Sequence, residues 1–387
     1  TMAINQSLHP PAEKLAGQFD TFDHYGDWQK AEGVPSQKGF YVEDLAAVEV
    51  YPWERKGGRG VFVNLEGTGG YNDTQIVEIA PGGKSAPERH LYEEMVYVVS
   101  GRGSTSVWYR EDHKQTFEWG RGSLFAIPLN AHYQHFNGSG SEPARYMAVT
   151  NAPSIIRTFH NLDFVFNNPY AFTDRFSDDQ GYFNDPGKLY KRKYNYLLQT
   201  NFVPDVHTIQ LYDHAARGGG GSNIGFELAE NSMAAHISEF SVGTYKKAHR
   251  HGPGAHVIIL DGVGFSVLWQ DGLEDHTRCD WKPGSVVVPP EDWFHQHFNT
   301  GAKPARYLAL RYSGSRHPQG YNATRGERTA LSLKQGGAQI EYEDEDPAIH
   351  KQFEAELAQH GATCRMKDYF SNCTGISGGF DLSGGDD

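Results

Sequence analysis

The sequence predicts an all-β fold made of two copies of one β domain, and three observations support this prediction. Short runs rich in Val, Tyr, Phe and Ile alternate with Gly-, Asn- and Pro-bearing turns from about residue 41 to 150 and again from about 224 to 312. A set of residues recurs at a nearly constant distance across these two regions. Pairs of histidines two residues apart lie in strand-like runs of the second region. With 387 residues, the chain is long enough for two domains with separate cores.

The internal repeat is the strongest of these observations, because a fixed period over many residues identifies duplicated units. The matching positions are Trp108 and Trp269, 161 residues apart; His135-Phe-Asn137 and His297-Phe-Asn299, 162 apart; and Pro143-Ala-Arg-Tyr146 and Pro304-Ala-Arg-Tyr307, 161 apart. The offset stays almost constant throughout, so the sequence predicts two tandem domains with the same strand order.

Histidine spacing predicts a metal site in the second copy. His249 and His251 are two residues apart, and side chains two apart on a strand share a face. His295 and His297 follow the same rule in a later run of the same copy. Three or four convergent imidazoles suit a divalent transition metal and suit Mg²⁺ or Ca²⁺ poorly.

The repeated residues resemble the two motifs of the cupin superfamily. In the second copy Gly243, His249, His251 and Gly262 match the first motif, and Gly284, Pro290, His295 and Asn299 match the second. In the first copy the fitting residues are His90, Glu94, Gly101, Gly122, Pro128 and Asn137. The resemblance covers well over half of the chain. It implies a bicupin, in which two tandem jelly-roll barrels (double-stranded β-helices) each enclose a pocket.

The second copy departs from the cupin motif at Ala255, where the family has a glutamate. His249, His251 and His295 remain as a three-histidine set, which resembles the metal sites of gentisate-dioxygenase-like and cysteine-dioxygenase-like cupins. That resemblance implies Fe(II) as the cofactor, with Mn, Ni or Zn as alternatives, and O₂ as a reactant. In the gentisate enzymes, however, the metal lies in the first cupin domain.

Five further residues of the second copy are candidates for the same pocket. His256 could be an additional ligand, although strand parity from the adjoining alanine turns it away unless the preceding glycine turn resets that parity. His297 is either a general base for the substrate or a core histidine. Arg306 and Arg311 lie in a late strand, and whichever points inward can clamp a carboxylate; because Arg145 repeats Arg306, we interpret Arg306 as structural. Trp293 either lines the pocket mouth or caps the barrel.

The first copy has a poorer ligand set. Glu88 stands where the second copy has its first histidine, and Tyr133 stands at the position of His295. A weak second site remains open, with His90, Glu94, His132 and His135 as its candidate ligands. We favour the alternative, a degenerate domain that supports its partner domain.

We divide the chain by its changes in composition. The predicted parts are an N-terminal extension (1–40), the first cupin domain (41–165), a connector (166–225), the second, metal-binding cupin domain (226–320) and a C-terminal extension with a disordered end (321–387). Residues 189–198 of the connector are expected to be helical. A second helix is expected to begin at Asp346-Pro347 and to end at Gly361, because Phe353 and Leu357 recur at helical spacing.

Composition restricts the partners. The formal net charge of -13 argues against nucleic acids and anionic membranes, and no apolar run approaches the roughly 20 residues that cross a bilayer. Cys279, Cys364 and Cys373 are scattered without a CxxC motif, so we expect neither a disulfide framework nor a thiolate zinc site. We expect a cytoplasmic protein that binds a small-molecule substrate, and the family resemblance implies a homo-oligomer.

Three functions remain open from the sequence. The first is a non-haem Fe(II) dioxygenase that cleaves a C–C bond of a small carboxylated or enolisable substrate, aromatic acids included. The second is a redox-neutral lyase, decarboxylase or isomerase that uses Mn, Ni or Zn. The third is a non-catalytic bicupin that binds a small molecule. We rank them in this order.

Overall fold

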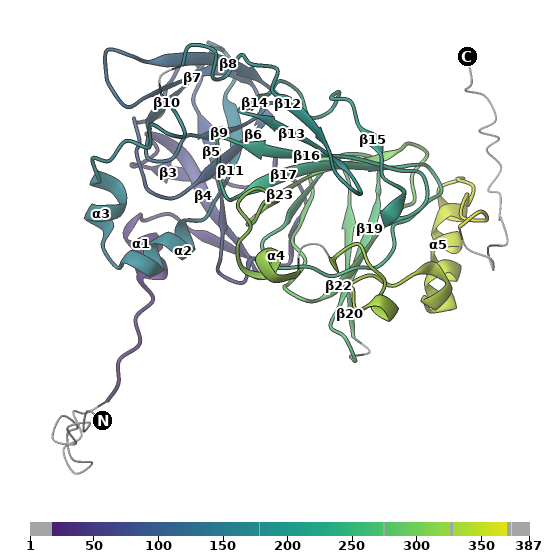
Figure 1. The fold of residues 1–387 in the computed structure, drawn as a ribbon. Helices are drawn as coiled ribbons and strands as arrows, with labels where there is room; N and C mark the ends of the chain where they lie inside the picture. Colours follow the sequence, from purple (N-terminus) through teal and green to yellow (C-terminus); the bar gives the residue numbers. More distant parts are fainter. Residues whose placement is uncertain (1–17, 178, 274, 326–327, 370–372, 374–387) are drawn as a thin grey trace, which may run out of the picture.

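The computed structural model describes residues 18–177, 179–273, 275–325, 328–369 and 373. Two β barrels lie side by side, and each is formed by a large sheet facing a sheet of three strands (Figure 1). The structure therefore confirms the predicted all-β fold with two tandem jelly rolls. None of the described helices is long and apolar enough to span a membrane.

The large sheet of the first barrel has the strand order β1-β4-β5-β11-β6-β9-β14, with β3 paired to β4, and its small sheet has the order β10-β7-β8. The strands are β1 (Ser36–Gly39), β3 (Tyr51–Trp53), β4 (Gly58–Leu65), β5 (Asp73–Ile79), β6 (Glu94–Ser100), β7 (Arg102–Trp108), β8 (Gln115–Gly120), β9 (Leu124–Ile127), β10 (His132–Asn137), β11 (Ala144–Thr150) and β14 (Phe202–Val203).

The second barrel repeats this arrangement. Its large sheet has the order β12-β13-β16-β17-β23-β18-β21-β2, with β15 paired to β16, and its small sheet has the order β20-β19-β22. The strands are β2 (Tyr41–Val42), β12 (Lys188–Lys191), β13 (Tyr196–Thr200), β15 (Tyr212–Asp213), β16 (Gly221–Leu228), β17 (Ala234–Phe240), β18 (His256–Asp261), β19 (Gly264–Trp269), β20 (His276–Trp281), β21 (Val286–Val287), β22 (Phe294–Asn299) and β23 (Ala305–Arg311).

The barrels exchange short strands. β2 lies between β1 and β3 in the chain but pairs with β21 of the second barrel, while β14 follows β12 and β13 in the chain but pairs with β9 of the first barrel. Apolar side chains of the two large sheets also form one buried cluster, which includes Met147 and Val149 of β11 together with Leu308 and Leu310 of β23. The second barrel is therefore held against the first by a shared core as well as by backbone pairing.

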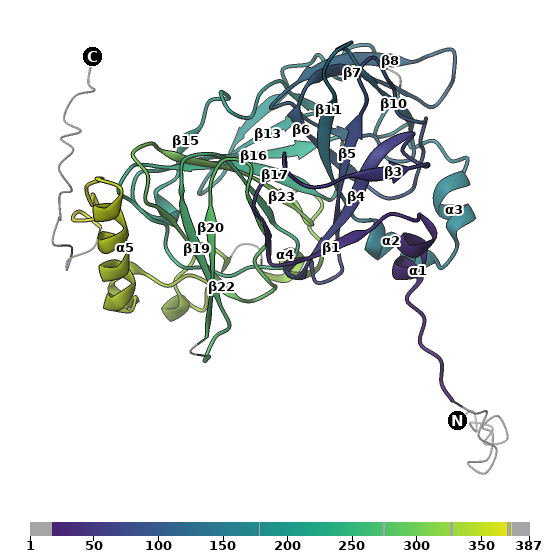
Figure 2. The same cartoon turned by 180° about the vertical axis from the view of Figure 1, so that it is seen from behind.

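The helices lie outside the barrels (Figures 1 and 2). They are α1 (His24–Ala31), α2 (Ala152–Phe159), α3 (Leu162–Asn167), α4 (Gly320–Arg325) and α5 (Pro347–Gln359), with 3₁₀ turns η2 (Glu66–Thr68), η3 (Ala215–Arg217), η5 (Leu333–Gln335) and η6 (Tyr342–Asp344). The predicted C-terminal helix is confirmed as α5, whose N-cap Asp346 accepts a hydrogen bond from the backbone of Ala348. The end predicted to be disordered lies outside the described residues.

The helix predicted over residues 189–198 is wrong. Its residues form the antiparallel pair β12 and β13, and β13 pairs in parallel with β16 of the second barrel. The segment contains no β-branched residue, although three of its ten residues are tyrosines, so local preference did not decide between helix and strand. Pairing with the open edge of β16 decides the conformation, which is a non-local effect.

Candidate metal centre

The three histidines of the second barrel come together where two chain segments meet. His249 and His295 form a two-residue antiparallel bridge, in which each backbone N–H donates to the other's carbonyl at 3.1 and 2.9 Å. His295 lies at the start of β22, and its side chain points into the barrel together with that of His297. His251 follows in the loop that leads to β18.

The three rings converge. Their centroids lie 4.4 Å apart for His249 and His295, 4.6 Å for His251 and His295, and 5.8 Å for His249 and His251. One ring nitrogen from each residue lies within 4.8 Å of the other two. His249 and His295 are buried and His251 is partly buried, so the group lies below the surface.

Backbone carbonyls orient all three rings. The Nδ1–H of His249 donates to the carbonyl of Lys247 at 3.0 Å, and that of His251 donates to Gly252 at 2.7 Å. The Nδ1–H of His295 donates to Trp293 at 3.3 Å. A carbonyl can only accept, so each Nδ1 carries the hydrogen and each Nε2 keeps its lone pair. Such an outer contact fixes the tautomer of metal-binding histidines.

Burial also keeps these imidazoles neutral. It holds the pKa values of His249 and His295 well below their usual range and lowers the pKa of His251 to about 4. The Arg217 guanidinium lowers all three pKa values further. Neutral imidazoles with preset lone pairs are the form that binds a transition metal, so the donor set fits Fe, Mn, Ni or Zn.

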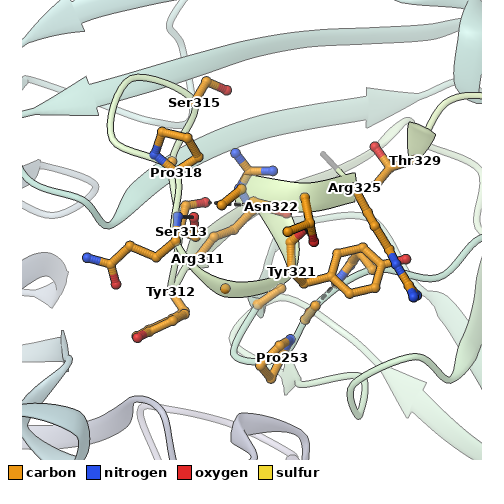
Figure 3. A pocket seen from close by; sticks show the side chains of 18 of the residues that line it. Pro253, Arg311, Tyr312, Ser313, Ser315, Pro318, Tyr321, Asn322, Arg325 and Thr329 are labelled. Carbon is orange, nitrogen blue, oxygen red and sulfur yellow. Dashed lines mark hydrogen bonds between the residues drawn. The ribbon is translucent and has the colours of Figure 1, made fainter. Parts of the chain in front are cut away.

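A cavity of about 490 Å³ opens from the three histidines into the second barrel. It adjoins an outer cavity of about 510 Å³ bounded by α4 and the segment after β23, where Arg311 and Tyr321 both face the space (Figure 3). Among the described residues that line the inner cavity there is no carboxylate. The cationic ones are Arg192, Lys193, Arg217, Lys246, Arg311 and Arg328.

Arg217 is one of the cationic residues of the cavity that sequence reasoning missed. The backbone N–H of Lys247 donates to its carbonyl, just as Ala86 donates to Lys56 in the first barrel. Lys56 and Arg217 are 161 residues apart, and each directly precedes a run of glycines, so the repeat already marked Arg217 as the equivalent of Lys56. Lys56 is neutralised by Glu88, whereas the equivalent of Glu88 near Arg217 is the neutral His249.

Arg217 is held rigidly near the histidines. Its Nη1 donates to the carbonyl of Thr329 at 2.6 Å and to Oε1 of Gln339 at 3.0 Å. Burial is the main cause that lowers its pKa to about 10, with a further contribution from Arg311. The substitution of a glutamate by a histidine therefore leaves excess positive charge in the second barrel.

Arg311 lines both cavities, whereas Arg306, which we interpreted as structural, and Trp293, for which the barrel cap was the alternative, line neither. Arg306 points out of the barrel, where Nη2 donates to the carbonyl of Ile209 at 2.5 Å and Nη1 pairs with Glu239 at 3.5 Å. Arg306 and Arg311 are five positions apart on β23, so the two-residue period places them on opposite faces. Trp293 packs beside Phe40, with ring centroids 6.3 Å apart, and is not among the residues that line either cavity.

His256 does not join the other three histidines. It lies on the same face of β18 as Ile258 and Leu260, which belong to the core between the barrels. The glycine turn before β18 therefore leaves the strand parity unchanged, and the hypothesis of a fourth ligand is wrong. Burial lowers the pKa of His256 to about 4, so this side chain is neutral.

His297 lines the inner cavity, but its position has a structural explanation. Its Nδ1 lies 2.7 Å from Oγ of Ser266, which accepts from Nε1 of Trp281 at 3.0 Å. The first barrel contains the same arrangement: Nδ1 of His135 lies 2.7 Å from Oγ1 of Thr105, to which Trp119 donates. Because the network recurs without a three-histidine group, we interpret it as a feature of the barrel core.

The proposed second site in the first barrel does not assemble. His132 stacks on Trp108 with ring centroids 5.5 Å apart, away from the others. The hydroxyl of Tyr133 lies 3.2 Å from Nε2 of His90 and donates to Oε2 of Glu94 at 3.0 Å. A tyrosine hydroxyl thus occupies the position of the ligand His295, and the described residues of this barrel contain no metal-binding group.

Known proteins share parts of this chain. The cupin domain family matches residues 75–150, which include nearly all of β5 and extend to the end of β11. A stretch of 112 residues is 31% identical to the L-ectoine synthase of Bordetella petrii and covers 29% of this chain and 78% of that protein.

Two solved structures illustrate the range of similar folds. Oxalate decarboxylase of Bacillus subtilis, described with Mn(II) centres, is 14% identical and aligns over 71% of this chain and 78% of its own, with a TM-score of 0.47. Vicilin of Corylus avellana is 11% identical and aligns over 70% of this chain and 85% of its own, with a TM-score of 0.45. Structural likeness at this level specifies no activity.

Proposed function

Because the chain belongs to the cupin superfamily and folds into two such barrels, we propose that it is a metal-dependent enzyme acting on a small anionic substrate in the second barrel. The observation that carries this proposal is the charge of the inner cavity. Six cationic side chains and no carboxylate line it among the described residues, although the whole chain has a net charge of -13. A cavity of this charge favours a carboxylate ligand.

The residues that bind the substrate are Arg217 and Arg311. Both side chains are half-buried, and burial lowers the pKa of each guanidinium. The attraction of Glu341 for Arg217 and of Glu227 for Arg311 offsets only part of this desolvation cost. A substrate carboxylate would receive charge-assisted hydrogen bonds from these groups and would lower that cost. Lys246 adds a third buried cation, whose Nζ lies 3.4 Å from the hydroxyl of Tyr307.

His249, His251 and His295 would hold Fe(II), and a metal held by three neutral ligands supplies open positions at which an anionic substrate and dioxygen bind together. On this basis we propose oxygen-dependent cleavage of a C–C bond in a carboxylated or enolisable substrate. The arginines fix the substrate's carboxylate, and the buried, neutral His297 forms part of the wall.

A redox-neutral reaction is the second candidate. The relative that matches over most of its own length is named as a synthase and not as an oxygenase. With Mn, Ni or Zn at the same three histidines, the cationic wall would bind the same class of carboxylate. The two proposals therefore share the site and the substrate class and differ in the requirement for oxygen.

Metal analysis followed by oxygen uptake tests the proposal. About one iron per chain, lost in His295→Ala, together with oxygen consumption on addition of an aromatic or enolic acid, is the result we expect. Turnover that proceeds equally under argon would support the redox-neutral alternative. A chain that binds no metal at these histidines after reconstitution would be a binding protein, and the proposal would be wrong.

A further inference from the structure

A second group of metal-binding side chains lies in the C-terminal extension, outside the barrels. It consists of His350 and Glu354 on α5 and of Cys364 and Cys373 after it, and one ligand atom of each lies within 4.8 Å of the others. All four residues are at least nine-tenths buried. We propose that this group binds a structural zinc ion.

The spacing of the ligand atoms fits zinc. Sγ of Cys364 lies 3.3 Å from Sγ of Cys373 and 4.0 Å from Nε2 of His350. Oε1 of Glu354 lies 3.6 Å from Sγ of Cys373 and 3.2 Å from Nε2 of His350. Zn–S bonds of about 2.3 Å and Zn–N or Zn–O bonds of about 2.0 Å place tetrahedral ligand atoms roughly 3.3 to 3.8 Å apart.

The elements explain why the four groups meet. His350 and Glu354 are four residues apart on α5, so their side chains project from the same face of the helix. Arg365 N donates to Gly243 O and ties the segment that follows Cys364 to the second barrel. The long spacing from the helix to Cys373 leaves no CxxC pattern, which is why the sequence did not reveal the group.

A hydrogen-bonded chain orients His350 toward the other ligands. The hydroxyl of Tyr245 lies 2.6 Å from Oε1 of Glu345 and 3.1 Å from Nδ1 of His350. The shorter contact assigns the tyrosine proton to Glu345, so Nδ1–H of His350 donates to Tyr245. The lone pair on Nε2 then faces the carboxylate and the two thiols, and a cation is the natural partner for these donors. Two sulfur ligands favour zinc over Mg²⁺ or Ca²⁺.

The ion would stabilise a part of the chain that has little core of its own. The apolar cluster around the four ligands consists of residues from the extension and of Tyr245, Phe265 and Phe298 from the second barrel. A small core of this kind is often reinforced by a structural metal. The same extension supplies Glu345, whose Oε2 accepts from Gln296 at 2.6 Å, between His295 and His297. Zinc would therefore support β22 from outside the barrel.

X-ray absorption at the zinc edge tests this inference on the full chain, purified with reductant and incubated with zinc. The His251→Ala variant is measured beside the wild type, because it empties the three-histidine centre and leaves the second group intact. We expect about one zinc per chain with two sulfur neighbours in that variant. Zinc with only nitrogen and oxygen neighbours, or no retained zinc, would overturn the inference.

Cysteine variants provide the second arm. Cys364→Ser should lose this zinc and make the extension sensitive to protease, while Cys279→Ser, at a buried cysteine in the barrel, should keep it.

If Cys364→Ser does not fold, replacement of zinc by cobalt in the wild-type protein still tests the proposal, because only thiolate ligands give a sulfur-to-cobalt charge-transfer band. The mass of the protein kept without reductant but with zinc gives a further check. A mass lower by two hydrogens, which indicates a disulfide between Cys364 and Cys373, would contradict the proposal. The inference does not depend on the proposed function, because these readouts concern different residues.

Discussion

His249 and His295 are joined by two backbone hydrogen bonds, and their imidazole rings lie 4.4 Å apart. In the first barrel the same backbone bridge joins Glu88 to Tyr133. The duplicated fold thus provides one geometry twice, and two side-chain differences decide which copy can bind a metal.

The first prediction concerns metal content. His251→Ala and His295→Ala each remove a ligand without disturbing the apolar core, so each variant should remain folded and lose the metal of the three-histidine centre. His90→Ala in the first barrel is the matched control and should keep that metal. Elemental analysis of the three proteins checks this, and equal loss in His90→Ala would show that the first barrel takes part.

The second prediction concerns the carboxylate. Arg311→Met should weaken the binding of a small dicarboxylate such as oxalate, because a charge-assisted hydrogen bond is worth about 1.5 to 3 kcal/mol, or roughly 10- to 150-fold in Kd. Arg306→Met, on the same strand but outside the cavity, should change the affinity little. Calorimetric titration of the metal-loaded proteins measures both. Equal effects of the two substitutions would argue against a role of Arg311 in anion binding.

The third prediction concerns the buried ion pair of the first barrel. Nζ of Lys56 lies 3.0 Å from Oε1 of Glu88, and both side chains are at least nine-tenths buried. Glu88→Gln removes the hydrogen-bonded anion and leaves the lysine charge only the Coulomb attraction of Glu94, so it should lower the free energy of unfolding by about 3 to 5 kcal/mol. Lys56→Met with Glu88→Gln should cost less than Glu88→Gln alone. Urea unfolding of the three proteins tests this, and an additive cost in the double variant would contradict it.

The repeat explains how far the sequence alone could lead. Its constant offset identified two barrels and placed His249, His251 and His295 on one inward face, because ligand spacing and strand parity are local properties. Arg217 could be recognised from the sequence as the repeat equivalent of Lys56. Its role, however, depends on the replacement of the acidic partner Glu88 by His249, and only the packed barrels show that these residues are partners. His350 and Cys373 meet through the path of the chain after α5, and no periodicity in the sequence encodes that path.

The last prediction concerns acid stability. Burial lowers the pKa values of His135 and His256 to about 4, whereas an unfolded histidine titrates near about 6.5. Above about pH 6.5 both states are neutral and the stability is complete; as the pH falls toward about 4, only the unfolded state takes up protons. Each residue should therefore cost on the order of 3 kcal/mol of stability over this range.

Urea unfolding between about pH 7.5 and 4.5 measures this proton linkage. His256→Leu removes one buried histidine from the face between the barrels, so the slope of unfolding free energy against pH should fall by about one proton. His360→Gln, at an exposed position after α5, is the matched control and should leave the slope unchanged. If His256→Leu kept the wild-type slope, the ring would already be protonated in the folded protein, and a buried cation at this apolar face would require an anionic partner.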